Sequence, residues 1–284
     1  MAGKEIVQGS SRLLFALGVN ILSFLACGSG AEETENLSGL AKIPGKDIFA
    51  VRENETTCLM VEFAARFHIP YDTWASNYVD LVTEQASVSM PGNAQVKGRC
   101  ARGATAQPEI IISWSDDSYI LKLYFDKETR NVTKRRQQHF WKVSKIKFTY
   151  DTSDSAHFKD AVNVGKFTAI SNPHMALFLT PMGHSYSCLT TETISLSAHD
   201  RQKVVVFKIS EAKMQPYEIA GDFLYGPESQ CTVDQRESLE ETLPLALGLA
   251  LGLIIVVIIG VYHLQHRLSG SAQPQQDRAN YKEM

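Results

Sequence analysis

Apolar residues follow three different patterns along the chain, and each pattern predicts a different kind of element. The longest is the stretch 243–262, LPLALGLALGLIIVVIIGVY, which holds twenty residues without a charge. A helix of that length rises about 30 Å, the thickness of a bilayer's hydrocarbon core, and satisfies every backbone amide within the segment. A buried helix of a soluble domain normally has only about 10–14 such residues. The stretch therefore predicts a transmembrane helix.

The N-terminus has the second pattern, a short apolar run behind positive charges. Lys4 and Arg12 precede an uncharged run at 13–26 that is too short to span a bilayer. Ser29 and Ala31 then stand at the small-residue positions of a signal-peptidase site. This predicts a cleaved signal peptide, with an uncleaved signal anchor as the alternative.

The charges beside the apolar stretch indicate its orientation. Glu237, Glu240 and Glu241 lie before it, whereas His263 and Arg267 follow it. Positive charge is retained on the cytosolic side of a membrane. We therefore expect a single-pass type I membrane protein with four parts: signal peptide 1–31, lumenal or extracellular domain 32–242, transmembrane helix 243–262 and cytosolic tail 263–284.

The third pattern is a series of short apolar runs separated by turn residues, which is typical of β-structure. In one run, Tyr119, Leu121, Leu123 and Phe125 alternate with polar positions, as in a half-buried strand. The Asp-Asp-Ser turn at 116–118 joins this run to the preceding one, so the two should form a hairpin. Strands are expected at 48–52, 57–63, 109–114, 118–125, 141–150 and 203–214.

Other segments are assigned from the same pattern. In the strand at 141–150 the alternation of apolar, inward-facing positions shifts phase between Val143 and Ile146, which predicts a β-bulge. A single helix is expected at 71–86. Polar composition predicts a flexible lead-in at 32–46, a loop at 92–108 and an exposed hairpin tip around the basic run 134–136. The domain as a whole should be mainly β.

Cysteine usage indicates an oxidising compartment. Cys27 falls within the predicted signal peptide, which leaves Cys58, Cys100, Cys188 and Cys231 for two disulfides. Four cysteines allow three connectivities. Two near-equal separations, of 42 and 43 positions, favour pairing in sequence order. Zinc binding is the competing interpretation, but no cysteine has another within two to four residues.

Three sequons fit this topology, at Asn36, Asn54 and Asn131, and none has proline in its middle position. All lie in the predicted lumenal domain, and we expect at least two to be glycosylated.

The sequence contains no catalytic signature. The segment Gly183-His-Ser185-Tyr-Ser187 fails the nucleophile-elbow pattern at its last position, and the histidines are scattered. No cofactor or metal is expected, and a formal net charge of −3 argues against a nucleic-acid partner. The function indicated is not enzymatic.

The tail carries a candidate sorting signal, Tyr281-Lys-Glu-Met284. An extended peptide of this form adds a strand to a partner's sheet edge, and its tyrosine and apolar residue fill two pockets. Clathrin adaptor medium subunits read such signals, so we expect them as partners. Chance is the alternative, because many tyrosines have an apolar residue three positions on.

Within the span, Gly248 and Gly252 form a Gly-x-x-x-Gly pattern that lets another helix approach closely. Glycine is also common in membrane helices. Self-association through the span and incidental glycine usage both remain open.

The chain resembles the lysosome-associated membrane glycoproteins. The similarity lies in type I topology, two cysteine loops of about forty residues and the sequences around the cysteines, Thr57–Met60, Ser185–Cys188 and Cys231–Asp234. It extends to Lys46–Asn54, Trp74–Leu81, Phe158–Val162 and Tyr281–Met284, which are most like a single-domain member of that family found in brain and dendritic cells.

The resemblance implies a β-prism lumenal domain with Cys58 paired to Cys100 and Cys188 to Cys231. It also implies a glycoprotein of endosomal and synaptic vesicles that modulates inhibitory transmission. The abundant lysosomal members have two lumenal domains and a glycine before the tail tyrosine; here there is one domain, and Asn280 holds that position. Early or recycling endosomes and the plasma membrane are therefore the expected locations. A cell-surface adhesion or ligand-binding receptor is the rival hypothesis, and the lumenal partner is unknown.

Overall fold

The computed structural model describes residues 32–41, 43, 45–75, 79–101, 107–133, 136–173, 175–198 and 203–270. The chain divides into two compact units, 1–229 and 230–284, and each is described by itself. The elements, in chain order, are β1 (Glu32–Asn36), a 3₁₀ turn η1 (Ser38–Leu40), β2 (Asp47–Glu53), β3 (Thr56–Trp74), β4 (Leu81–Ser89), β5 (Gln95–Arg99), β6 (Glu109–Trp114), β7 (Tyr119–Thr133), β8 (Arg136–Asp151), β9 (Lys166–Ser171), β10 (Leu177–Pro181), β11 (Ser185–Cys188), β12 (Glu192–Ala198), β13 (Val204–Gln215), β14 (Glu228–Gln230) and α2 (Thr232–Gly270).

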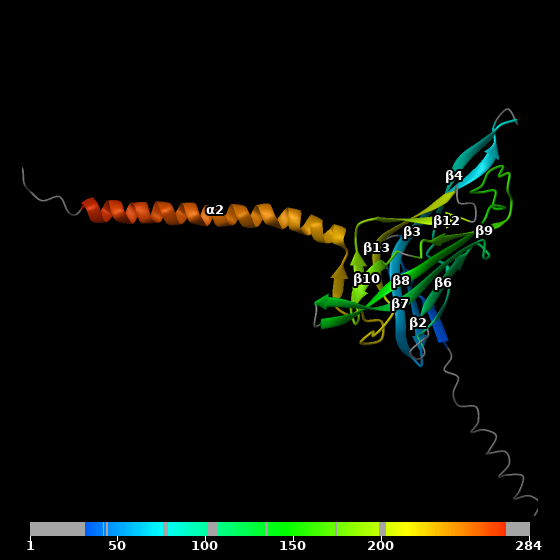
Figure 1. Cartoon of the computed structure of the whole chain (residues 1–284), viewed down its shortest axis with the longest axis horizontal. Coiled ribbons are helices and arrows are strands. Elements are labelled where there is room, and N and C mark those ends of the chain that lie inside the picture. The colour runs from blue at the N-terminus through cyan, green and yellow to red at the C-terminus, as the bar shows by residue number, and fades with distance from the viewer. Residues whose placement is uncertain are drawn as a thin grey trace, which may run out of the picture. The chain divides into compact units, whose positions relative to one another are not determined.

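The first unit is built from one continuous, strongly bent sheet (Figure 1). Its strands follow the order β1-β2-β3-β13-β12-β9-β8-β7-β6-β5, with β4 added beside β3, β10 beside β8, β11 beside β13 and β14 beside β11. The prediction that the domain is mainly β is therefore confirmed.

The long strand β3 connects most of these parts. It pairs antiparallel with β2, β13 and β4 at different points along its nineteen residues. Side chains of a strand alternate between the two faces of the sheet. In β3 the inward positions from residue 61 onward are all buried: Val61, Phe63, Ala65, Phe67, Ile69, Tyr71 and Thr73.

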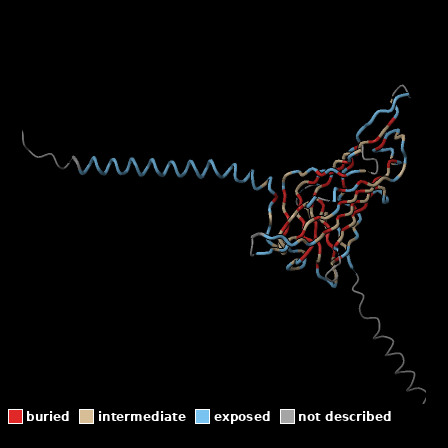
Figure 2. Tube along the Cα trace, viewed as in Figure 1, coloured by how far each residue is buried: buried red, intermediate tan, exposed pale blue. Residues whose placement is uncertain are grey.

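Aromatic rings fill the space that the bent sheet encloses, where buried residues concentrate in Figure 2. The ring of Phe67 stacks on Phe148 at a centroid distance of 3.8 Å and on Phe207 at 4.7 Å. Trp114 and Tyr119 extend this cluster. Strands β3, β6, β7, β8 and β13 thus share one core.

Side chains join the two ends of the sheet order, β1 and β5. The hydroxyl of Thr34 donates to the carbonyl of Val96 at 2.9 Å. The amide nitrogen of Asn36 donates to the carbonyls of Gly92 and Ala94, at 3.0 and 2.7 Å. Since β1 and β5 are the first and last strands of that order, these bonds close the sheet on itself.

Glycine is required where β5 approaches β2. A Cβ atom at Gly98 would collide with the side chain of Val51, which is itself fully buried. The close approach packs β5 against β2, while its ladder with β6 holds Gln95–Arg99 as a strand.

Several local predictions are confirmed. Strands β6 and β7 form the expected hairpin. Strand β8 has its bulge at Ser144, because Tyr124 pairs with Lys145 whereas Phe125 pairs with Val143. The hydroxyl of Ser144 donates to the carbonyl of Tyr124 at 3.2 Å. The hairpin of β7 and β8 extends to Arg136; residues 134 and 135 lie outside the described residues.

Three predictions are wrong. The helix expected at 71–86 is instead the end of β3 and most of β4, which pair from Arg66 with Ser89 to Trp74 with Leu81. The lead-in at 32–46 contains β1, which pairs with β2. The loop expected at 92–108 contains β5, which pairs with β6. In each case pairing with the neighbouring strand along the chain outweighs local composition.

The closure of the sheet predicts a stability effect. Replacing Asn36 by Ala removes two donated bonds and the one that its side-chain oxygen accepts from the Ser38 amide at 2.9 Å. Unglycosylated protein should lose about 1.5–4.5 kcal/mol of unfolding free energy, because three hydrogen bonds at roughly 0.5–1.5 kcal/mol each are removed. Denaturant unfolding measures this, with exposed Asn93→Ala in the neighbouring turn as the matched control. Equal effects of the two substitutions would contradict the closure.

Candidate functional site

The first predicted disulfide is present and joins β3 to the end of β5. Cys58 and Cys100 are bonded, with their Cα atoms 5.8 Å apart. Cys100 is buried. A closed loop of this size lowers the entropy of the unfolded chain, which in the entropic model raises the free energy of unfolding by about 4 kcal/mol. Cys188, at the end of β11, and Cys231, just before α2, are disulfide-bonded as well. The structure therefore has the two expected disulfides.

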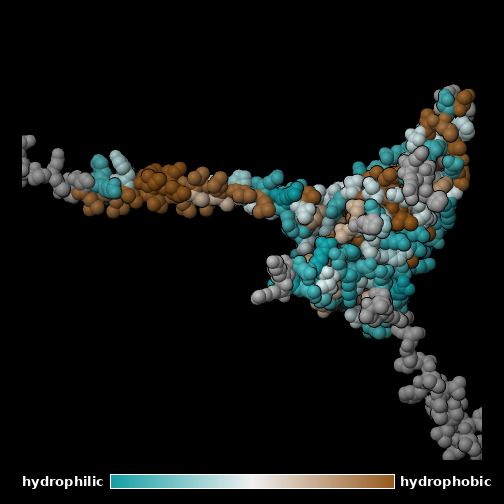
Figure 3. Space-filling model, in the orientation of Figure 1, coloured by the Kyte–Doolittle hydropathy of each residue, from teal (hydrophilic) through white to brown (hydrophobic). Residues whose placement is uncertain are grey.

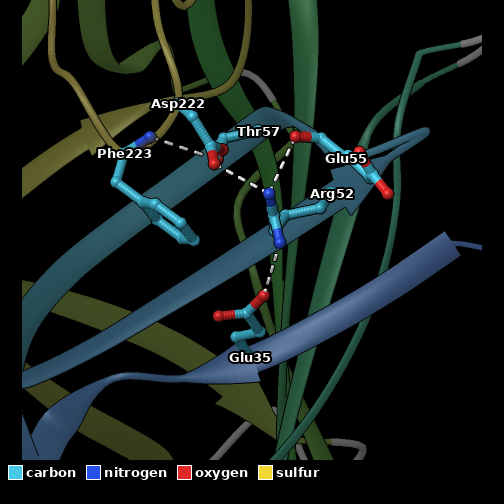
Figure 4. A network of polar contacts seen from close by, with 6 residues as sticks. All are labelled: Glu35, Arg52, Glu55, Thr57, Asp222 and Phe223. Atoms are coloured by element: carbon cyan, nitrogen blue, oxygen red, sulfur yellow. Dashed lines mark hydrogen bonds and ion pairs between the residues drawn. The ribbon is translucent and has the colours of Figure 1, made fainter.

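An arginine network lies near this disulfide and holds three segments together (Figure 4). Arg52 of β2 donates to the carboxylate of Glu35 in β1 at 2.9 Å and to that of Asp222 at 2.7 Å. Its guanidinium also donates to the carbonyl of Glu55 at 2.7 Å and lies 4.9 Å from the ring centre of Phe223. No local sequence pattern predicts this network, because Arg52 and Asp222 are 170 positions apart.

Asp222 is held in its charged form by this network. The hydroxyl of Thr57 donates to it at 2.5 Å, and Arg52 supplies a positive charge. The hydrogen bond from Thr57, and then the charge of Arg52, lower the pKa of Asp222. The network joins β1, β2 and the segment around Asp222, so its geometry indicates a structural role.

The three sequons lie in different environments. Asn54 is exposed in the two-residue turn between β2 and β3, where Asn54 and Glu55 have φ values of 50° and 63°. Asn131 is exposed near the tip of the β7–β8 hairpin. Asn36 uses its amide nitrogen for the two bonds that close the sheet. A glycan there would replace one of the donated hydrogens, which favours occupancy at Asn54 and Asn131.

A cavity of about 210 Å³ lies beside the β3–β4 hairpin, where a helix had been expected. Its lining includes the rings of Tyr71, Tyr150 and Phe167 together with the ion pair of Lys203 and Asp72, whose atoms are 2.5 Å apart. Burial, hydrogen bonding to Glu84 and the charge of Glu84 raise the pKa of Tyr71, so this phenol stays protonated at neutral pH. The cavity is mainly apolar and offers a place for a small hydrophobic group rather than for acid–base chemistry.

The second unit is dominated by α2, a helix of 39 residues. The apolar stretch 243–262 lies within it, and this is the one candidate membrane span among the described residues. Apolar side chains cover this part of the helix (Figure 3). A Cβ added at Gly248 or Gly252 would meet no atom within 4 Å, so their face of the helix is open; self-association there remains a prediction.

Comparison with known proteins shows the family. The model for the luminal domains of lysosome-associated membrane glycoprotein 2-like proteins matches residues 38–232. Human lysosome-associated membrane glycoprotein 5 is 50% identical over 89% of each chain, and its Xenopus tropicalis counterpart is 45% identical over 93% of this chain and 94% of that one. The chain belongs to the lysosome-associated membrane glycoprotein family.

More distant family members agree in fold. Mouse lysosome-associated membrane glycoprotein 1 is 27% identical over 70% of this chain and 43% of its own. The crystal structure of the membrane-distal domain of mouse lysosome-associated membrane protein 2 superposes with a TM-score of 0.50 at 21% identity, covering 65% of this chain and 98% of that one. The sheet described here is thus the lumenal fold of the family. These relatives are named as membrane glycoproteins and not as enzymes.

Two predicted features lie outside the described residues. They are the signal peptide, 1–31, and the tail residues 271–284 with Tyr281 and Met284. Both remain predictions from the sequence.

The arginine network predicts a pH dependence of stability. Because the pKa of Asp222 is lowered on folding, its contribution is present above the ordinary pKa of an aspartate, about 4, and is lost as pH falls below it. Thermal midpoints of wild type and Asp222→Asn should therefore differ at pH 7 and converge as the pH falls through the lowered pKa of Asp222. Asp116→Asn, in the exposed β6–β7 turn, serves as the control. A difference that is constant with pH would contradict the role assigned to the Asp222 charge.

Proposed function

We propose that this protein is a non-enzymatic vesicle glycoprotein that cycles between the plasma membrane and early or recycling endosomes. The observation that carries the proposal is the sequence Tyr281-Lys-Glu-Met284, on the side of the span that the flanking charges assign to the cytosol. Family membership and the one candidate span among the described residues support the membrane-glycoprotein part of the proposal.

The distance from the membrane suits recognition by an adaptor. Helix α2 continues eight residues beyond Tyr262, and Tyr281 lies eleven residues beyond Gly270. An extended chain reaches about 3.3–3.6 Å per residue, so eleven residues span up to roughly 36–40 Å. The tyrosine can therefore enter the sheet-edge site of a clathrin adaptor medium subunit while the span stays in the bilayer.

The resemblance to single-domain family members suggests where this cycling takes place. We propose endosomal and synaptic vesicles of neurons, with an effect on inhibitory transmission. A cell-surface adhesion or ligand-binding receptor is the second candidate, since exposed strands and a cavity offer binding surfaces in the lumenal domain. Steady-state location separates the two, because a receptor should lie mostly at the surface and a cycling cargo mostly inside cells.

The tail signal is tested by surface labelling and antibody uptake of tagged wild type beside Tyr281→Ala. The mutant should accumulate at the surface and stop internalising, because one of the two pocket anchors is lost. The tail peptide should bind an isolated adaptor medium subunit at least about 30-fold more weakly, as expected for loss of a 2 kcal/mol anchor. Lys282→Ala is the matched control, because Lys282 lies beside Tyr281 in the sequence but is neither of the two residues expected to fill the pockets.

Two results would contradict the proposal. The first is that Tyr281→Ala is internalised as wild type is. The second is that Lys282→Ala shows the same defect as Tyr281→Ala. If the first pair were indistinguishable, the tail sequence would be a chance match and the function would lie in the lumenal domain or the span.

A further inference from the structure

Two positive side chains face each other directly on the outer surface of the sheet. Arg66 of β3 is paired with Lys208 of β13, and Phe67 and Phe207 in the next register position point into the core. Both cations are exposed. Like charges placed directly opposite each other in a sheet are destabilising, so this pairing has a cost to the isolated fold.

Hydroxyl groups surround the two cations. Ser89 of β4 pairs with Arg66 on one side, and Thr193 of β12 pairs with Lys208 on the other. The row Ser89-Arg66-Lys208-Thr193 thus crosses four adjacent strands on one face. Such a row presents two positive charges together with polar donors to solvent.

Neither cation is neutralised within the part of the chain that the structure describes. No carboxylate there forms an ion pair with Arg66 or Lys208, and the Nε of Arg66 donates only to the Ser89 hydroxyl at 3.2 Å. His68 is the next outward residue of β3. Burial, and then the charges of Lys208 and Arg66, lower the pKa of His68, as expected beside uncompensated positive charge.

A groove of about 440 Å³ lies beside these cations. Its lining includes both cations, the hydroxyls of Ser89 and Ser210, and Glu211. Glu211 sits at the β-bulge of β13 with φ of 51°, and its Oε2 atom is buried without a donor among the described residues. The groove therefore combines a site for an anion with an acceptor that lacks a hydrogen-bond donor.

We propose that this groove binds an acidic saccharide. A carboxylate or sulfate of the sugar lies between Arg66 and Lys208, which removes the repulsion between them, and a sugar hydroxyl donates to Oε2 of Glu211. A saccharide fits better than an acidic peptide because it supplies an anion and several hydroxyl donors within one ring. The volume lies within the range of about 300–1,000 Å³ that is usual for ligand sites.

The proposal is independent of the tail signal. It requires only that the domain faces the lumen or the cell exterior, where acidic glycans occur. Failure of the tail experiment would leave it untouched, and its own failure would not affect the cycling proposal.

The test uses the full-length protein in nanodiscs and a heparin-derived hexasaccharide as the probe, with affinity measured by calorimetry at physiological ionic strength. Arg66→Gln and Lys208→Gln should each weaken binding about tenfold or more, as expected for loss of a hydrogen bond to a charged group. Lys97→Gln is the matched control, because Lys97 is an exposed cation on β5. It should leave the affinity within about twofold, as for a solvent-exposed charge outside the site.

Folding is monitored in the same samples. The thermal midpoints of Arg66→Gln and Lys208→Gln should equal or exceed that of wild type, because each substitution removes a like-charge repulsion. A loss of binding without a fall in the midpoint is then due to the site and not to unfolding.

A second variant separates a saccharide site from a general anion site. Glu211→Gln should weaken binding of the hexasaccharide, because a hydroxyl loses a charged acceptor, and hexaglutamate should bind more weakly than the hexasaccharide to wild type. Three results would overturn the proposal: no binding of the hexasaccharide, equal binding by both cation variants and wild type, or hexaglutamate binding as tightly as the hexasaccharide with no effect of Glu211→Gln.

Discussion

The fold depends on the register of β3. Its nineteen residues pair with β2, β13 and β4, and its inward side chains supply the aromatic core around Phe67. A shift of one residue would turn Arg66 and His68 into that core and Phe67 to solvent, because the side-chain period of a strand is two. One register therefore determines both the apolar interior and the polar outer face.

The same register positions the groups that carry function. Cys58 near the start of β3 bonds to Cys100, which fixes the end of β5 while Thr34 and Asn36 hold β1 against that strand. Further along, Arg66 faces Lys208 and borders the proposed saccharide groove. The inward face of these strands thus stabilises the fold, and their outward face is free to bind a ligand.

The sequence predicted the features that depend on neighbouring residues. The β6–β7 hairpin followed from the alternation ending at Phe125 and the turn at 116–118, and the bulge at Ser144 followed from a change of phase. The apolar stretch 243–262 lies in a helix, as expected of twenty uncharged residues that must satisfy their backbone hydrogen bonds within the segment. Two disulfides followed from an even number of cysteines in a predicted lumenal domain.

Features that depend on which strands pair could not be predicted in this way. The segment 71–86 has apolar residues at a spacing that suits a helix, yet pairing of β3 with β4 determines its structure. Pro70 did not break β3, because the ladder with β13 ends at His68 and the proline nitrogen needs no acceptor there. Likewise, nothing local connects Arg52 with Asp222, or Arg66 with Lys208, before the strands are assembled.

The orientation of the domain across the membrane is the central claim, because the disulfides, the glycans, the saccharide groove and the tail signal all require it. Protease protection tests it most directly, in cells whose plasma membrane alone is permeabilised and with an epitope at the C-terminus. The account predicts that protease removes the epitope while a glycosylated, disulfide-bonded domain fragment stays intact. An epitope that resists protease, on a chain that carries no glycan, would contradict it.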